Sequence, residues 1–207
     1  TGCSYLNQHL LEGFAPQKIT TVFGQSGVGK STYALYLNNK QINKQIPAMR
    51  FSLEMPLISE MDRLIAQRLH LPISELYYNE EMDMGIKEEV LHLVEKEREK
   101  LENLPYFRYV EEEGLYIKDI EEMIDKAKKE MGVDYMVVTI DLLTMIKDFN
   151  VGSDSKAVLY ENAMNSLHEM VRRQNIHLVG VVQSKRPSGK VNVNSVDDIE
   201  RLRPGIE

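Results

Sequence analysis

Hydrophobic and polar positions follow two distinct patterns along this chain, and each pattern predicts one kind of element. Short runs of apolar and β-branched residues, bounded by Gly, Pro or polar residues, are typical of strands. Five such runs occur, at residues 18–23, 48–53, 106–110, 135–140 and 176–182. The run at 135–140 (YMVVTI) is almost wholly apolar, which predicts a strand that is buried on both faces of its sheet.

Between these runs, apolar residues three and four positions apart predict helices. Such segments occupy residues 31–39, 58–69, 117–131 and 157–174. The segment 85–103 is dense in Glu and Lys and predicts a solvated helix, with Val90, Val94 and Leu101 on its buried side. Strands that alternate with helices predict an α/β fold, in which helices cover both faces of a parallel sheet.

Composition and charge further restrict the classes of protein to which the chain can belong. The chain has 207 residues, 43% of them hydrophobic, which suits one compact domain with its own core. No apolar run approaches the ~20 residues that cross a bilayer, and the first residues do not form a signal peptide. A single cysteine, Cys3, cannot form an internal disulfide, which favours a reducing, cytoplasmic compartment. The net charge of −7 argues against a chain coated with nucleic acid but allows a few basic loops.

One loop carries a pattern that binds phosphate. Residues 24–31 read GQSGVGKS, which is G-x-x-x-x-G-K-[ST] placed between a predicted strand and a predicted helix. Glycines let backbone amides curl around a phosphate, and the following helix adds its positive N-terminus. Lys30 can reach the β- and γ-phosphates, and the Ser31 hydroxyl can ligate Mg²⁺. The predicted ATP-binding residues of this P-loop are Gly24, Gln25, Ser26, Gly27, Val28, Gly29, Lys30, Ser31 and Thr32.

Polar residues at the ends of other strands are candidates for the chemistry of this site. Asp141 follows the most apolar run, where an acid for Mg²⁺ should lie, although a turn-initiating Asp would look the same. Many P-loop ATPases place a glutamate next, but Leu142 stands there, so a general base would have to come from another strand. Glu54 and Gln183 end two other runs, and the carboxyl ends of parallel strands open onto one crevice. A surface or helix-capping role for Glu54, and an ordinary polar strand exit for Gln183, remain alternatives.

Together these motifs resemble the motor domain of DnaB-type replicative helicases, a branch of the RecA-like ATPases. The residues FSLEM at 51–55 carry the most specific part of the resemblance. Residues 140–143 (IDLL) and 182–184 (VQS) are similar to the family's IDYLQL and LSQL. The pairs TG, LN and GF within residues 1–14 resemble its lead-in, so the likeness runs nearly from end to end.

The resemblance implies a role for each candidate residue. Glu54 would be the general base, Asp141 the acid that holds Mg²⁺ together with Ser31, and Lys30 the group that neutralises developing charge. Gln183 would sense the γ-phosphate and couple it to DNA. Its strand should lie between the P-loop strand and the strand of Asp141. ATP and Mg²⁺ are the implied cofactors.

The resemblance also implies an architecture and partners. Residues 1–207 would form a single RecA-like ATPase domain of a longer protein, without its N-terminal helical domain, its linker helix and the C-terminal end of the motor. The whole protein would be a hexameric replicative helicase that couples ATP hydrolysis to translocation on single-stranded DNA. Primase and a helicase loader are further implied partners. This chain alone is expected to be a monomer or weak oligomer with low ATPase activity.

Some positions depart from the family pattern. Leu142 and Thr144 stand where the family has tyrosine and glutamine, and Pro56 replaces a small polar residue. These departures leave the polar surroundings of Asp141 open. The arginine finger is expected beyond the end of this chain.

Two loops after the Asp141 and Gln183 strands are candidates for DNA contact. Residues 148–155 contain no basic residue, whereas residues 184–203 contain several among Gly and Pro. The candidate DNA-binding residues are Lys185, Arg186, Lys190, Arg201 and Arg203. Without the family resemblance, a solvated loop diluted by Asp and Glu would explain the same stretch equally well.

Two other functional classes fit the same residues. The domain could be a RecA-like ATPase of recombination or nucleoprotein remodelling that does not unwind duplex, which a strand-displacement assay would distinguish. It could instead be a regulatory ATP-binding module without turnover, although a module freed from hydrolysis need not keep Lys30, Glu54 and Asp141. A small-molecule kinase is disfavoured by the FSLEM residues and by the missing lid signature.

Overall fold

Five parallel strands form one sheet in the order β1-β5-β4-β2-β3. The computed structural model describes residues 8, 13–76, 84–152 and 155–184. Within them the strands are β1 (Lys18–Gly24), β2 (Ala48–Ser52), β3 (Phe107–Val110), β4 (Met136–Asp141) and β5 (Ile176–Gln183). The strand of Gln183 therefore lies between the P-loop strand and the strand of Asp141, as the family resemblance implies.

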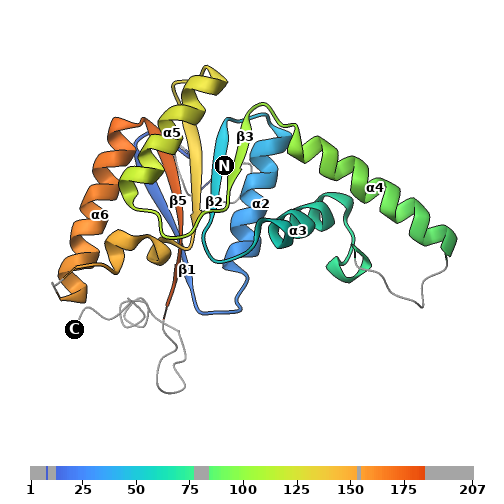
Figure 1. The fold of residues 1–207 in the computed structure, drawn as a ribbon, viewed down its shortest axis with the longest axis horizontal. Helices are drawn as coiled ribbons and strands as arrows, with labels where there is room; N and C mark the ends of the chain where they lie inside the picture. Colours follow the sequence, from blue (N-terminus) through green and yellow to red (C-terminus); the bar gives the residue numbers. More distant parts are fainter. Residues whose placement is uncertain (1–7, 9–12, 77–83, 153–154, 185–207) are drawn as a thin grey trace.

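Helices cover both faces of this sheet (Figure 1). One face carries α5 (Ile117–Met131) and α6 (Lys156–Arg173), and the other carries α2 (Lys30–Asn43) and α3 (Leu57–Leu69). Helix α4 (Met84–Glu102) extends outward from the β3 side of the molecule. Short 3₁₀ turns are η1 (Ile73–Leu76), η2 (Leu143–Met145) and η3 (Lys147–Phe149). In the described part of the chain, no helix combines the length and the apolar character needed to span a membrane.

Successive residues of the central strand β4 face opposite layers of the core. Val138 and Ile140 pack in the cluster under α5 and α6, whereas Val137 packs in the cluster under α2 and α3. Every residue of β4 is buried, which confirms the prediction of a strand covered on both faces. The two apolar layers hold the strand ends at fixed positions, and the site is built on those ends.

Each predicted element is present, but the helix after the P-loop is longer than predicted. It continues to Asn43, and its last turns bury the polar side chains of Asn38, Asn39 and Gln41 beside Ile42. Asn38 is fully buried and donates to Thr139 Oγ1 on β4 and to Gln41 Oε1, each at 2.9 Å. Polar residues therefore take several of the buried positions here, which weakens the apolar periodicity. In α4, Val94 and Leu101 are buried as predicted, and Val90 is partly buried.

Gly180 in β5 allows the chain after β4 to pack tightly against the sheet. A Cβ at Gly180 would lie 2.2 Å from Leu143 Cδ1 and 2.8 Å from Leu143 Cγ. Leu143 is two residues from Asp141, so this contact determines how the chain leaves the strand that carries the candidate acid.

We expect Gly180→Ala to lower the free energy of unfolding by about 1–3 kcal/mol, because the added methyl group overpacks against Leu143. Urea unfolding followed by circular dichroism measures this change. Leu143→Ala in the same chain should make room for the methyl group, so the double variant should lose less stability than the two single variants summed. Strictly additive losses would show that the two side chains do not meet.

Candidate functional site

The P-loop connects the end of β1 to the start of α2. Gly27 and Gly29 have φ values of 82° and 89°, a left-handed backbone that a residue with a Cβ rarely adopts. Lys30 is the first residue of α2 and is largely buried, and its Nζ donates to the carbonyl of Gln25 at 2.7 Å. The ammonium group therefore lies inside the curl of the loop, where the pattern requires it for phosphate binding.

Glu54 and Gln183 lie at the same edge of the sheet as the loop. The Leu53 N–H donates to Asp141 O at 2.8 Å, and Ser52 Oγ donates to Met55 O at 2.6 Å, so the chain turns directly after β2 with Glu54 exposed. On the other side, Gln183 is the register partner of Gly24. Parallel pairing therefore places Gln183 beside the P-loop and brings Glu54 to the same edge of the sheet.

These residues line one cavity of about 250 Å³, which we call the P-loop hollow. Its walls come from the loop, the start of α2, the turn after β2, helix α3 and the end of β5. The lining residues are Ser26, Gly27, Gly29, Lys30, Ser31, Thr32, Glu54, Met55, Arg63 and Gln183. The hollow thus unites most predicted ATP-binding residues with Glu54 and Gln183, whereas Gly24, Gln25 and Val28 do not line it.

Asp141 lies beneath the surface and does not line the hollow. Its side chain is 3% exposed, and its Oδ2 accepts a hydrogen bond from Arg50 Nη2 at 2.9 Å. Its Oδ1 is buried without a hydrogen-bond partner in the described part of the structure. Leu142 packs in a small cluster with Ala34 and Val181. A carboxylate at this position would face apolar side chains and would be badly placed to act as a base.

Arg50 is the centre of a buried polar network that links Asp141 to two helices. It is fully buried in β2, and it donates from Nε and Nη2 to the two carboxylate oxygens of Glu60 on α3, at 2.7 and 2.5 Å. Its Nη1 donates to Asn38 Oδ1 on α2 at 3.2 Å. Burial works to lower the pKa of the Arg50 guanidinium, but the hydrogen bond and charge of Glu60 and the charge of Asp141 outweigh it, so the pKa is raised. Arg50 is therefore a permanent buried cation.

Three of these residues were not anticipated from the sequence. Arg50 interrupts the apolar run AMRFSL, and a charge inside a buried strand requires a partner, so the signal was present but the partner was not identifiable. Glu60 and Arg63 lie on the helix at 57–69, where their charges look like those of any solvated helix face. Only the folded structure shows that Glu60 is buried in the core and that Arg63 lines the P-loop hollow.

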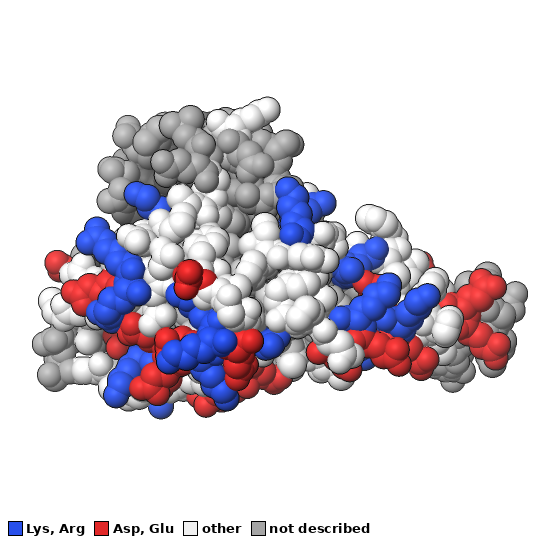
Figure 2. Space-filling view, turned by 90° about the horizontal axis from the view of Figure 1, so that it is seen from above, with Lys and Arg blue, Asp and Glu red and all other residues white. Residues whose placement is uncertain are grey.

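The candidate DNA contacts are largely outside the described residues. Lys185, Arg186, Lys190, Arg201 and Arg203 all belong to the segment 185–207, which the structure does not describe. In the other candidate loop, Asp148 Oδ2 accepts a hydrogen bond from the Ile117 N–H at 2.8 Å and so stabilises the start of α5. Figure 2 shows Lys and Arg interspersed with Asp and Glu over the visible described surface, without a patch of one sign.

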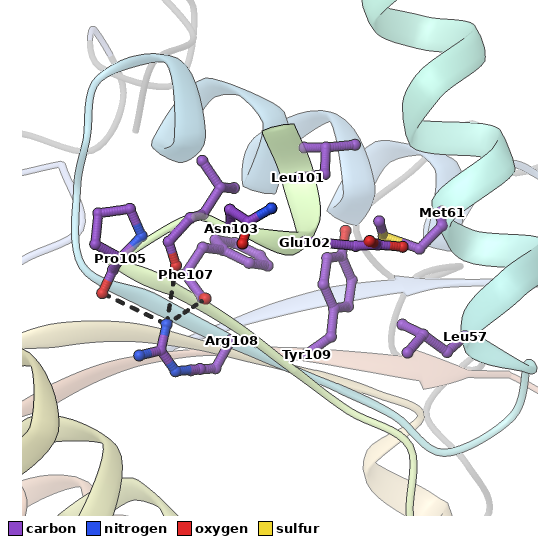
Figure 3. Close-up of a pocket in the computed structure, with 10 residues that line it drawn as sticks. Leu57, Met61, Leu101, Glu102, Asn103, Pro105, Phe107, Arg108 and Tyr109 are labelled. Carbon is purple, nitrogen blue, oxygen red and sulfur yellow. Dashed lines mark hydrogen bonds between the residues drawn. The ribbon is translucent and has the colours of Figure 1, made fainter. Parts of the chain in front are cut away.

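A second cavity, of about 530 Å³, lies at the outer edge of the sheet between β3, the end of α4 and the start of α3 (Figure 3). Arg108 turns back along its own strand and donates from Nη1 to the carbonyls of Leu104 and Phe107, at 2.9 and 3.0 Å. None of the predicted site residues lines this cavity. It therefore belongs to the sheet edge and not to the phosphate site.

The strand order and the P-loop at the end of the first strand place this molecule in the class of RecA-like P-loop ATPase folds. The family model of the DnaB-like helicase C-terminal domain matches residues 1–194. This chain belongs to that family, which confirms the resemblance found in its sequence motifs.

Solved structures agree on the fold. A DnaB-like replicative helicase, solved in a study of its interactions with primase, aligns with a TM-score of 0.75 and 16% identity, over 86% of this chain and 42% of that one. The ATPase domain of a second protein aligns with a TM-score of 0.66 and 16% identity, over 82% of this chain and 58% of that one. This chain therefore spans about half the length of these two structures. No curated protein sequence matches it significantly.

Proposed function

We propose that this chain is the ATP-hydrolysing motor domain of a hexameric replicative DNA helicase, and that it couples hydrolysis to translocation on single-stranded DNA. The observation that carries the proposal is the P-loop hollow, which brings the P-loop, Glu54 and Gln183 together in a chain of the DnaB-like family. Residues from separate segments, all at the carboxyl edge of one sheet, are the arrangement that phosphoryl transfer requires.

Nucleotide binding would use the predicted residues of the loop. The amides between Gln25 and Gly29 would surround the β-phosphate, the Lys30 ammonium would neutralise charge on the β- and γ-phosphates, and Thr32 would contact the α-phosphate side. Arg63, the residue missed at the sequence level, adds a second cation to the same cavity. Among the described residues it has no hydrogen-bond partner, so its guanidinium is available to a phosphate.

The residues present fit a magnesium ion beside the phosphates. Ser31 lines the P-loop hollow, and the free Oδ1 of Asp141 is a buried acceptor that lacks a partner in the described residues. Mg²⁺ prefers one or two protein oxygens together with water and substrate phosphates. Ser31 and Asp141 would hold it, and the bound ion would supply charge neutralisation at the phosphates.

Glu54 would orient and deprotonate the attacking water. Its side chain is exposed at the lip of the hollow, opposite the P-loop, and it is not engaged by any hydrogen bond in the described structure. Gln183, paired with Gly24, would hydrogen-bond the γ-phosphate. Loss of this phosphate on hydrolysis would then shift the segment that follows directly, 185–203. Lys185, Arg186, Lys190, Arg201 and Arg203 would contact DNA phosphates there.

The proposal includes a larger assembly. Residues 1–207 would form one domain of a longer protein, and a neighbouring subunit of the ring would complete the site with an arginine. Primase and a helicase loader are proposed partners of the whole protein. One of the similar structures comes from a study of a helicase with primase, which supports the primase proposal by relationship only.

Glu54→Gln should slow single-turnover ATP hydrolysis by about 10²–10⁴-fold, because the amide cannot accept a proton from water. ATP affinity should stay near the wild-type value, since the substitution leaves the P-loop intact. Rapid-quench measurement of the assembled protein tests both statements. Glu112→Gln, at an exposed glutamate outside the P-loop hollow, is the matched control. A Glu54→Gln protein that hydrolyses bound ATP at the wild-type rate would rule out Glu54 as the base.

Arg63→Gln should weaken ATP binding by about 10- to 150-fold, because a charge-assisted hydrogen bond contributes roughly 1.5–3 kcal/mol. AMP, which lacks the β- and γ-phosphates, should lose little affinity. Isothermal titration with both nucleotides checks this difference. Arg172→Gln, on the exposed side of α6, should change neither value. Equal losses for ATP and AMP would show that Arg63 does not contact the terminal phosphates.

Lys185→Ala with Arg186→Ala should weaken binding of single-stranded DNA at all sequences. The slope of log affinity against log salt should fall in magnitude by about 1.4, because each lost phosphate contact removes roughly 0.7. Fluorescence anisotropy of the oligomer over a salt series measures both quantities. Lys118→Ala with Lys126→Ala on α5 removes the same charge elsewhere and serves as the control. Unchanged affinity and slope would exclude these contacts.

A further inference from the structure

A buried three-residue charged cluster joins β2, β4 and α3. Its cation is Arg50, and its anions are Glu60 and Asp141, all between 0 and 3% exposed. Arg50 and Asp141 lie on neighbouring strands, two register positions apart, because Arg50 pairs with Thr139 and Ser52 pairs with Asp141. Side chains two positions apart along a strand share a face, so both point to the layer of α2 and α3.

The geometry leaves Arg50 little freedom. Its guanidinium is a rigid planar fork, and Glu60 binds two of its nitrogens at 2.7 and 2.5 Å. Asn38 accepts from a third nitrogen at 3.2 Å, and Asn38 is itself held to Thr139 on β4. One atom, Nη2, contacts both Glu60 and Asp141. The position of the Asp141 carboxylate is therefore tied to α2 and α3 through one guanidinium.

The two oxygens of Asp141 have different environments. Oδ2 accepts from Arg50, whereas Oδ1 is buried and lacks a partner among the described residues. A buried carboxylate oxygen without a partner costs free energy unless something else binds it. We infer that Arg50, clamped by Glu60, is a positioning residue that holds Asp141 by Oδ2 and so presents Oδ1 to the hydrated magnesium ion of a bound nucleotide. This inference rests on the function proposed above.

A purely structural role explains the cluster less well. Replacing a buried ion pair by apolar residues of similar size is often neutral or stabilising, so stability alone does not require Arg50 and Glu60. An orienting role does require the pair. Residues that hydrogen-bond a metal ligand typically change metal affinity 10–100-fold when they are removed. The two explanations therefore predict different effects on magnesium binding and can be separated.

The decisive variant replaces both members of the pair, Arg50→Met with Glu60→Leu. It removes one positive and one negative charge, so the cluster keeps its net charge of one negative unit on Asp141. A change in magnesium affinity then does not come from a change in the net charge of the cluster. Binding of a fluorescent ATP analogue to the full-length protein, titrated with Mg²⁺ from an EDTA baseline, measures the magnesium requirement directly and without turnover.

We expect the double variant to need about 10–100-fold more Mg²⁺ for half-maximal binding, while its metal-free nucleotide affinity and cooperative unfolding stay close to wild type. Arg50→Lys should give an intermediate shift, because one ammonium group cannot reproduce the fork. The matched control is Arg68→Met with Glu97→Leu, a second Arg–Glu pair, joined at 2.5 Å between α3 and α4, that does not contact Asp141. It should leave the magnesium requirement unchanged whatever it does to stability.

The outcomes are distinguishable. A folded double variant with the wild-type magnesium requirement overturns the positioning role and leaves the proposed function intact. If the double variant does not fold, Arg50→Lys decides, since a folded Lys variant with an unshifted requirement overturns the role equally. Wild-type protein that binds no nucleotide at any Mg²⁺ concentration overturns the proposed function itself, and with it this inference.

Discussion

Parallel pairing of the strands is the constraint on which the site depends. Because every strand of the sheet runs in the same direction, the carboxyl ends of β1, β2, β4 and β5 all meet at one edge. The pairing of Gly24 with Gln183 places a polar side chain beside the P-loop, and the hydrogen bond from Leu53 to Asp141 aligns the ends of β2 and β4. The two apolar layers keep this edge in register, since a slip of one residue would move each side chain into the opposite layer of the core.

A second constraint acts inside the sheet, where a strand that should be apolar carries a cation. Arg50 is fully buried, and a buried charge persists only if its partners meet it with good geometry. Glu60 and Asn38 supply those partners from two different helices, so the network joins α2, α3 and the sheet through polar bonds in addition to apolar packing. The same network ends at Asp141, so one guanidinium links the candidate metal ligand to both helices.

The sequence predicted the architecture well because the relevant signals are local. Apolar runs such as 135–140 and helical spacing such as 58–69 depend only on neighbours along the chain, and the P-loop is itself a contiguous pattern. The strand order was not local and came from the family resemblance. What escaped prediction depends on contacts between distant residues: Glu60 is ten residues from Arg50, and Asp141 is 91 residues from it. The second half of α2 escaped for a related reason, because its buried Asn38 finds its partner Thr139 on β4, 101 residues away.

The position after Asp141 shows how sequence and structure combine. Leu142 excludes a base next to the acid, and the structure gives a physical reason for that choice, since the side chain packs against Ala34 of α2 and Val181 of β5. A carboxylate there would be buried among apolar groups without a partner, which costs several kcal/mol. Under the proposed function, the base would come from another strand end at the P-loop hollow, and among the described residues Glu54 is the acid that lines it. With these proposed roles, Asp141 lies under the surface, where Arg50 holds it, and Glu54 lies exposed at the hollow, where water can reach it.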